Sequence, residues 1–449
     1  MDSGSTFLAP GRGTPDKTWI ANHKHHHGRY FGRSQDVYFD FHVYNTCIHT
    51  YNSSREGEVH ITVSKGSGLP NLRRIRLAEG LTQDSLAEAA GISRITYQKI
   101  ESGESVPKVS TLQSIAQALG VELQDLLVPM EIPSMIRFRA YKRLNTREAI
   151  ILDVIKWLRD YSDLEKRLGK ENELEYHLSS LAEELKGQKP GRERAIHVAM
   201  RVRTELGIGA EGSIRDICGL LESAGIKVYP KAVTTDAFFG LSISPEDGGP
   251  AIVVNSWDRI SVERWIFTAV HELGHLLLHL DTFDVNQTEE EKGQEEEANV
   301  FASHFLMPEA VFKRGWEEAG GWPLIDRVMK VKRIFRVSYR TVLFRLQDEI
   351  PDIWRKFQIE HKHRYGKTLN WKKEPDPLTA DGFWASYPEP HRAHEPDNID
   401  SKQCFVPDRL AKLVRAAIEG KKITLSRGAE ILRIDLAMMR AWATSWSGA

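Results

Sequence analysis

The sequence is poor in cysteine, with Cys47, Cys218 and Cys404 as its only three among 449 residues. Because they are odd in number and far apart, neither a disulfide framework nor a zinc site built from cysteine is supported. No apolar run approaches the roughly 18 residues that a membrane helix needs, and the N-terminus lacks the apolar stretch of a signal peptide. We therefore expect a soluble, cytoplasmic protein with reduced thiols and no membrane partner.

An excess of charge of one sign is also lacking. The 61 Lys and Arg residues balance 62 Asp and Glu residues, which gives a formal net charge of −1. This balance argues against a histone-like protein or a polybasic membrane binder, but it is compatible with a local basic patch. With 41% hydrophobic residues, the composition is that of a globular protein, and the length suggests about three domains.

Between residues 71 and 127, capping residues and glycines predict five short helices. Thr82 and Ser93 are the expected caps of the second and third helices, and Gly91 ends the second. The helices are predicted at 71–79, 83–90, 94–101, 110–119 and 122–127. A short helix, a glycine turn and a second capped helix form a compact pair whose second helix can enter the major groove of DNA.

The outward residues of that second helix are Arg94, Thr96 and Lys99. Together with Gln83, at the start of the preceding helix, they can meet base edges or phosphates of double-stranded DNA. Arg94 suits guanine, whereas Lys99 is expected to contact a phosphate. A helical module for protein interaction is the alternative. Operator binding by such a domain normally requires a homodimer.

The rest of the chain predicts helices with a few strands. Three long amphipathic helices are expected within 146–206, and Gly248 and Gly249 mark a turn between two strand-like runs. The strand-like runs lie at 226–229, 238–244 and 251–255, and further helices are predicted at 261–280, 294–306, 323–347, 408–418 and 426–442. The expected fold class is therefore mainly α with a small antiparallel β-sheet (α+β).

One predicted helix carries the run His271-Glu272-Leu273-Gly274-His275. Residues four apart on a helix differ by about 40° in direction, so both imidazoles can share one metal ion. Glu272 points about 100° round the helix and can reach a water on that ion rather than the ion itself. This HExxH arrangement is typical of zinc peptidases, so Zn²⁺ is the expected cofactor and Glu272 the expected catalytic residue.

A catalytic zinc ion needs a third protein ligand and an open fourth position. Glu295, 20 residues after His275, opens the next predicted helix and is the preferred candidate, with Glu297 as the second. Asn299 lies one turn beyond Glu295 on the same face, where its side chain can hydrogen-bond a ligand histidine. His279 is expected in the core or at its rim.

Two segments resemble known families. The segment 81–103 resembles the XRE-type helix-turn-helix of phage repressors. The segment 264–275, followed by 295–308, resembles the ImmA/IrrE family of zinc metallopeptidases, whose members cleave transcriptional repressors in phage, mobile-element or stress-response circuits. By this resemblance His271, His275 and Glu295 are the zinc ligands and Glu272 is catalytic.

The resemblance implies a DNA-binding regulator with a zinc endopeptidase domain that cleaves a protein substrate, a repressor or partner. Two alternatives stay open: a transcription factor whose metallopeptidase fold is a non-catalytic sensor or dimerisation scaffold, and an antitoxin-like autoregulator. The expected parts are a disordered extension (1–66), a helix-turn-helix domain (67–130), a helical connector (131–206), a metallopeptidase domain (207–350), a proline-rich linker (351–400) and a C-terminal helical element (401–449).

Overall fold

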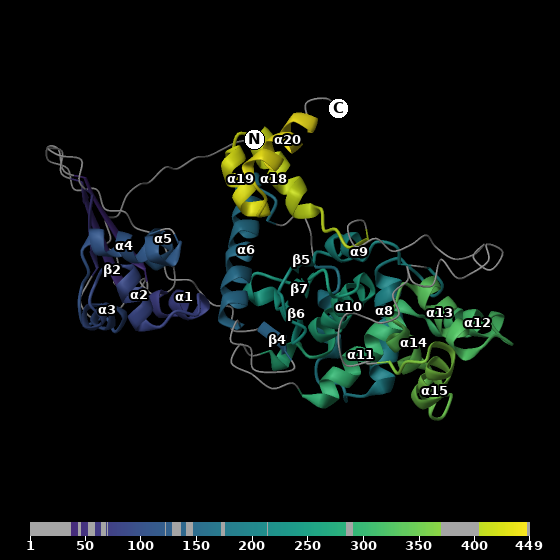
Figure 1. Ribbon diagram of the computed structural model, residues 1–449. Coiled ribbons are helices and arrows are strands. Elements are labelled where there is room, and N and C mark those ends of the chain that lie inside the picture. The colour runs from purple at the N-terminus through teal and green to yellow at the C-terminus, as the bar shows by residue number, and fades with distance from the viewer. Residues whose placement is uncertain are drawn as a thin grey trace, which may run out of the picture. The chain divides into compact units, whose positions relative to one another are not determined.

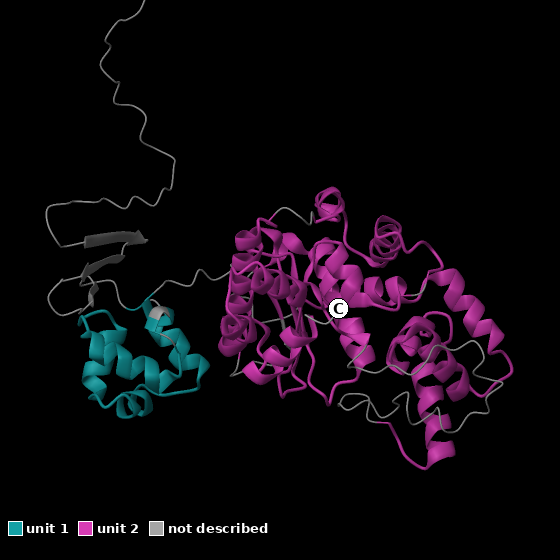
Figure 2. Ribbon diagram, turned by 90° about the horizontal axis from the view of Figure 1, so that it is seen from above, with its two compact units in different colours: residues 1–130 teal, residues 131–449 magenta. Residues whose placement is uncertain are grey.

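The chain forms two compact units, Met1–Met130 and Glu131–Ala449 (Figure 2). The computed structural model describes residues 37–43, 46–52, 59–63, 69, 71–121, 123–127, 136–140, 147–171, 176–212, 214–283, 291–369 and 404–446. Within these ranges the protein is mainly helical, as predicted (Figure 1). No helix in the same ranges is long and apolar enough to cross a membrane.

The first unit contains a three-stranded antiparallel sheet in the order β1-β2-β3. Its strands are β1 (Val37–Val43), β2 (Thr46–Asn52) and β3 (Val59–Val63). These strands differ from the disorder predicted for 1–66. Their runs are rich in Val, Tyr, Phe, Thr and Ile, which favour strands, and the Gly, Ser and Asn around them hid that signal. The other residues of 1–66 lie outside the described part of the chain.

Five short helices follow in the first unit, as predicted from their caps. They are α1 (Leu72–Ala78), α2 (Gln83–Ala89), α3 (Arg94–Glu101), α4 (Val109–Leu119) and α5 (Leu123–Leu127). The Thr82 side chain accepts a hydrogen bond from the backbone N–H of Ser85, and the Ser93 side chain accepts one from that of Thr96. These bonds satisfy amide groups that have no partner within the helix, so α2 and α3 begin where the caps stand.

The second unit is built on a mixed four-stranded sheet in the order β4-β6-β7-β5. Its strands are β4 (Ile136–Ala140), β5 (Lys227–Lys231), β6 (Phe238–Ile243) and β7 (Ala251–Asn255). The predicted antiparallel pairing of β6 with β7 is confirmed, with η1 (Pro245–Asp247) between them. The sheet is not wholly antiparallel, because β5 pairs parallel to the far side of β7. The sequence did not predict β4, which pairs antiparallel to β6.

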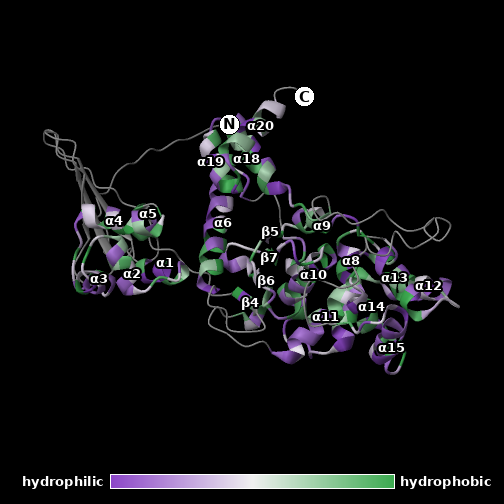
Figure 3. Ribbon diagram, in the orientation of Figure 1, coloured by the Kyte–Doolittle hydropathy of each residue, from purple (hydrophilic) through white to green (hydrophobic). Residues whose placement is uncertain are grey.

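The second unit also contains the following helices. They are α6 (Arg147–Leu168), α7 (Ser179–Leu185), α8 (Arg192–Glu205), α9 (Ile217–Ser223), α10 (Val262–Leu278), η2 (Leu280–Thr282), α11 (Lys292–Leu306), α12 (Glu309–Glu318), α13 (Leu324–Phe335), α14 (Tyr339–Leu346), α15 (Ile353–Tyr365), α18 (Arg409–Glu419), α19 (Leu425–Leu432) and α20 (Leu436–Trp446). Along α6, hydrophobic residues recur among hydrophilic ones (Figure 3), and the buried ones lie three or four residues apart, as on an amphipathic helix.

Several helices end earlier than predicted. The helix expected at 323–347 is divided at Arg336, and the one at 426–442 at Arg433, where the backbone is left-handed with φ of 54° and 57°. Such a turn at a residue other than glycine has no strong sequence signal. Of the three long helices expected in 146–206, α7 is short. Helix α15 occupies part of the predicted linker 351–400, whose proline-rich stretch lies outside the described residues.

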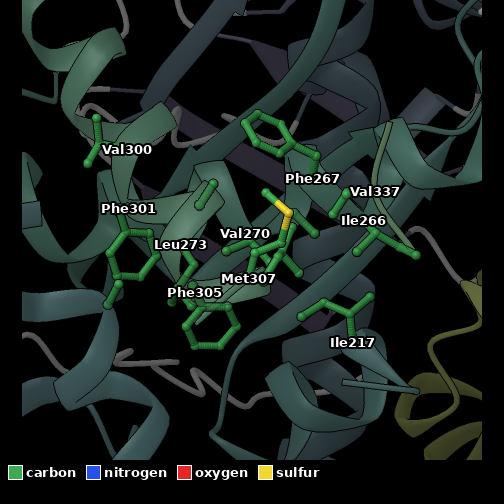
Figure 4. Close-up of a cluster of buried hydrophobic side chains, with 14 of the residues drawn as sticks. Ile217, Ile266, Phe267, Val270, Leu273, Val300, Phe301, Phe305, Met307 and Val337 are labelled. Atoms are coloured by element: carbon green, nitrogen blue, oxygen red, sulfur yellow. The ribbon is translucent and has the colours of Figure 1, made fainter. Parts of the chain in front are cut away.

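The hydrophobic core of the second unit gathers around α10. This helix packs against β6 and β7 and against α11 and α7. Figure 4 shows Val270 and Leu273 of α10 clustered with Phe301 and Phe305 of α11, all of them buried. Because α10 is covered on all sides, a polar side chain on it has to find its partners inside the protein.

Candidate metal centre and DNA interface

Helix α10 holds His271, Glu272 and His275 in the interior of the second unit, where each is 0% exposed. The apolar residues around them hold the helix between the sheet and α11. Burial of three ionisable side chains on one helix costs free energy unless each has a partner. Their contacts therefore indicate what this part of the molecule can do.

Three side chains converge between α10 and α11. The Nε2 atoms of His271 and His275 are 2.9 Å apart. The carboxylate of Glu295 places one oxygen 3.3 Å from Nε2 of His271 and the other 3.1 Å from Nε2 of His275. Around a tetrahedral zinc ion with bonds of about 2.0–2.1 Å, neighbouring ligand atoms lie about 3.3 Å apart. The three groups therefore fit a zinc ion and leave one position for water or a substrate.

The protonation of His275 suits a metal ligand. Burial lowers its pKa well below the usual range, although the carboxylate of Glu295 beside the ring acts in the opposite direction. The imidazole is therefore neutral near pH 7, and a neutral imidazole is the form that binds a metal ion.

Both histidines have a partner on the ring nitrogen that faces away from the convergence point. Nδ1 of His271 lies 3.0 Å from Oδ1 of Asn299. Nδ1 of His275 lies 2.9 Å from Nδ1 of His279, which in turn contacts Glu297. His279, expected in the core or at its rim, is thus a buried partner of His275. Glu297, the second candidate for the third ligand, is turned toward His279 instead of the metal group.

The carboxylate of Glu272 is held against strand β6. Its Oε2 accepts a hydrogen bond from the Ser242 hydroxyl, and that hydroxyl also lies 3.4 Å from the Glu272 carbonyl oxygen. On the same strand, a Cβ at Gly240 would lie within 3.0 Å of the Glu272 side chain, so the glycine makes room for it. No local pattern indicates either partner, because the packing of β6 against α10 is a tertiary contact.

Arg137 was also missed. It lies on β4, is 7% exposed and donates to Oε1 of Glu295 at 3.1 Å and to the side chain of Gln294. A hydrogen bond to a ligand carboxylate fixes its orientation. A single arginine at an unpredicted strand, 158 residues before its partner, carries no local signal.

In the first unit, helix α3 exposes the residues expected to meet DNA. Arg94, Thr96 and Lys99 are exposed. Arg94 lies 3.3 Å from the exposed Asp84. Gln83 is half-buried and donates to Glu101.

Two further features of α3 concern its attachment to the neighbouring helices and its exposed surface. Glu101 also binds Arg76 and the Tyr97 hydroxyl, so it ties the start of α2 to the end of α3. Ile95, which was not among the residues expected to meet DNA, is 67% exposed on the same helix. An outward apolar residue between Arg94 and Thr96 can contact the methyl group of thymine.

Two segments of the chain match known protein families. The family described as "Helix-turn-helix" matches residues 72–126, and the family described as "IrrE N-terminal-like domain" matches residues 221–347. An uncharacterized HTH-type transcriptional regulator of Sinorhizobium fredii, y4dJ, is 38% identical over 61 residues, which are 14% of this chain and 79% of that protein. The chain therefore belongs to the HTH-type transcriptional regulators, and it joins their DNA-binding domain to an IrrE-like domain of metallopeptidase type.

Proposed function

We propose that this regulator is a zinc-dependent endopeptidase that hydrolyses a peptide bond in a transcriptional repressor or another partner protein. The observation that carries the proposal is the placement of Glu272. Its buried carboxylate is fixed by Ser242 and lies on the helix that brings His271 and His275 to Glu295. A purely structural metal site has no need of such a carboxylate.

The chain supplies binding groups and a proton acceptor. His271, His275 and Glu295 would hold the ion, with Asn299 orienting His271. When bound, zinc supplies Lewis acidity that polarises a carbonyl and makes water a nucleophile near pH 7. Glu272 then takes the proton from the attacking water and passes it to the leaving amine, which is general acid–base catalysis.

For the first unit, we propose that residues 67–130 bind operator DNA through Arg94, Thr96, Lys99 and Gln83. Domains of this type read two half-sites with two copies, so the chain would act as a homodimer. Residues 207–350 would form the peptidase domain. Cleavage of a repressor would then change transcription in a stress-response, phage or mobile-element circuit.

The test incubates the zinc-loaded full chain with the repressors that are encoded beside its own gene and looks for their cleavage. We expect defined fragments, and Glu272→Gln should reduce their rate of formation by about 10²–10⁴-fold, because Gln has nearly the same size but cannot accept the proton. The variant should keep zinc and DNA affinity. If Glu272→Gln cleaves or responds like the parent, the fold is a non-catalytic sensor or scaffold.

A further inference from the structure

A series of hydrogen bonds leads away from the candidate metal group. Beyond His275, the ring of His279 contacts Nδ1 of His275 at 2.9 Å and Oε2 of Glu297 at 3.0 Å. The guanidinium of Arg194 donates to both oxygens of Glu297, at 2.7 Å each. None of these four side chains is more than 8% exposed. They come from three elements, since Arg194 lies on α8 and Glu297 on α11.

Glu297 accepts hydrogen bonds from three partners in this series. Besides His279 and Arg194, the backbone N–H of Gly191 donates to it at 3.0 Å, at the start of α8. A carboxylate at the first turn of a helix is also stabilised by the helix dipole. Paired through both oxygens with the guanidinium of Arg194, the carboxylate has its charge balanced inside the protein. The carboxylate is therefore ionised and only accepts hydrogen bonds.

The ionised carboxylate determines which ring nitrogens carry protons. Because Glu297 accepts, Nε2 of His279 has to donate to it. Because Arg194 already balances the charge of Glu297, the buried ring of His279 is neutral and its Nδ1 is an acceptor. Nδ1 of His275 then carries the proton and donates it to His279, so Nε2 of His275 has no proton and carries a lone pair. That nitrogen is the one that faces His271 and Glu295.

We infer that His279, Glu297 and Arg194 are positioning residues that lock His275 in the tautomer with its Nε2 free to bind the metal ion. This inference rests on the proposed zinc site but concerns residues that do not touch the ion. Outer partners of this kind are typically worth 10–100-fold in metal affinity.

The far end of the series is open to small solutes. A cavity of about 700 Å³ is lined by Arg194, Glu297 and His279, together with Leu278 and Gln188. Arg194 also donates to the backbone oxygens of Gln188 at 3.0 Å and of Leu278 at 3.4 Å. Because this cavity already reaches Glu297, truncation of Arg194 would leave space beside the carboxylate that a free guanidinium ion can occupy.

The first experiment measures the zinc dissociation constant of the full chain by competition with a chelator, and the absorption spectrum of the Co²⁺-loaded protein. We expect His279→Leu to weaken zinc binding by about 10–100-fold and to change the Co²⁺ spectrum. His279→Gln should restore most of the affinity, because its amide oxygen can accept from His275 and its N–H can donate to Glu297. Glu296→Ala, at the exposed neighbour of Glu297, is the control and should change neither quantity.

The second experiment uses Arg194→Ala, which should weaken zinc binding in the same direction. Millimolar guanidinium chloride should restore the affinity of Arg194→Ala and leave His279→Leu unaffected, whereas the same concentration of sodium chloride should restore neither. Equal zinc affinity and equal Co²⁺ spectra in the parent and His279→Leu would overturn the inference, as would equal losses in His279→Leu and His279→Gln. A parent protein that binds no zinc would instead defeat the proposed function.

Discussion

A Cβ built on Gly240 would lie only 2.9 Å from Oε1 of Glu272. The same atom would be 2.7 Å from Cγ2 of Thr268 and 3.0 Å from the carbonyl oxygen of Val253. Strand β6 is therefore in close contact with its neighbour β7 and with α10, and a side chain at position 240 would press against the carboxylate of Glu272. Glycine is needed here for space, so that the carboxylate can lie against the strand.

Gly240→Ala should therefore displace the carboxylate of Glu272 without removing it. We expect proteolysis to fall by about 10²-fold or more, toward the effect of losing a general base, while zinc affinity is retained. Gly315→Ala is the matched control, because a Cβ there would meet its nearest atoms at 3.9 Å and 4.0 Å. Fragment formation and metal content are measured in parallel, and unchanged proteolysis in folded Gly240→Ala would contradict the placement of Glu272.

The two carboxylates Glu295 and Glu296 should differ sharply in metal binding. Glu295 contacts both ligand histidines, whereas Glu296 is exposed. Glu295→Ala should lower zinc occupancy from about one ion per chain to a small fraction, because two remaining ligands hold zinc poorly. Glu296→Ala should leave it unchanged. Metal analysis after dialysis measures the zinc content of both variants. If Glu296→Ala loses zinc and Glu295→Ala keeps it, Glu295 is not the third ligand.

Arg94 and Lys99 should have different effects on DNA binding. Arg94→Ala should relax sequence preference by about 1–3 kcal/mol at one base pair, if its exposed guanidinium binds guanine. Lys99→Ala should weaken binding to all sequences alike and lower the slope of log affinity against log salt by about 1. Gel-shift titrations on an operator and its single-base variants distinguish these results. Uniform loss of affinity in Arg94→Ala would make Arg94 a phosphate contact.

The stability of the fold should depend on pH through Glu222, whose carboxylate contacts the start of α18. Its carboxylate accepts hydrogen bonds from the backbone N–H groups of Asp408 and Arg409, at 3.0–3.3 Å. Burial raises its pKa from 4.5 to about 7, although these hydrogen bonds oppose the change. The folded state therefore holds the proton more tightly than the unfolded chain, and this stabilisation is complete below pH 4.5 and lost as the pH rises through 7.

Glu222→Gln should abolish that dependence, which amounts to about 3 kcal/mol at most. We expect the free energy of unfolding by urea to vary less between pH 5 and 8 in this variant than in the parent. Glu419→Gln, at an exposed residue of α18, serves as the control. If Glu222→Gln and the parent show the same pH profile, Glu222 titrates at its ordinary value.

The parts of the fold that local sequence encodes were predictable. Thr82 and Ser93 mark helix starts by their own side chains, and the spacing of His271 and His275 follows from helix geometry. The parts that depend on tertiary pairing were not. Nothing near Arg137 indicates that its strand pairs with β6, and Arg336 adopts a left-handed turn that its residue type does not favour.

Strand β4 shows that the family match and the folded domain begin at different residues. The IrrE-like match begins at residue 221, yet the sheet beneath α10 is completed by residues 136–140, and Arg194 comes from α8. A gene fusion or recombination event that joined this signature to a new partner at residue 221 would leave one edge of β6 without its neighbour and Glu297 without its cation. An unpaired strand edge invites association with other chains. The shortest segment that could be transferred between genes with these contacts intact therefore begins before residue 136, within a few residues of the DNA-binding domain.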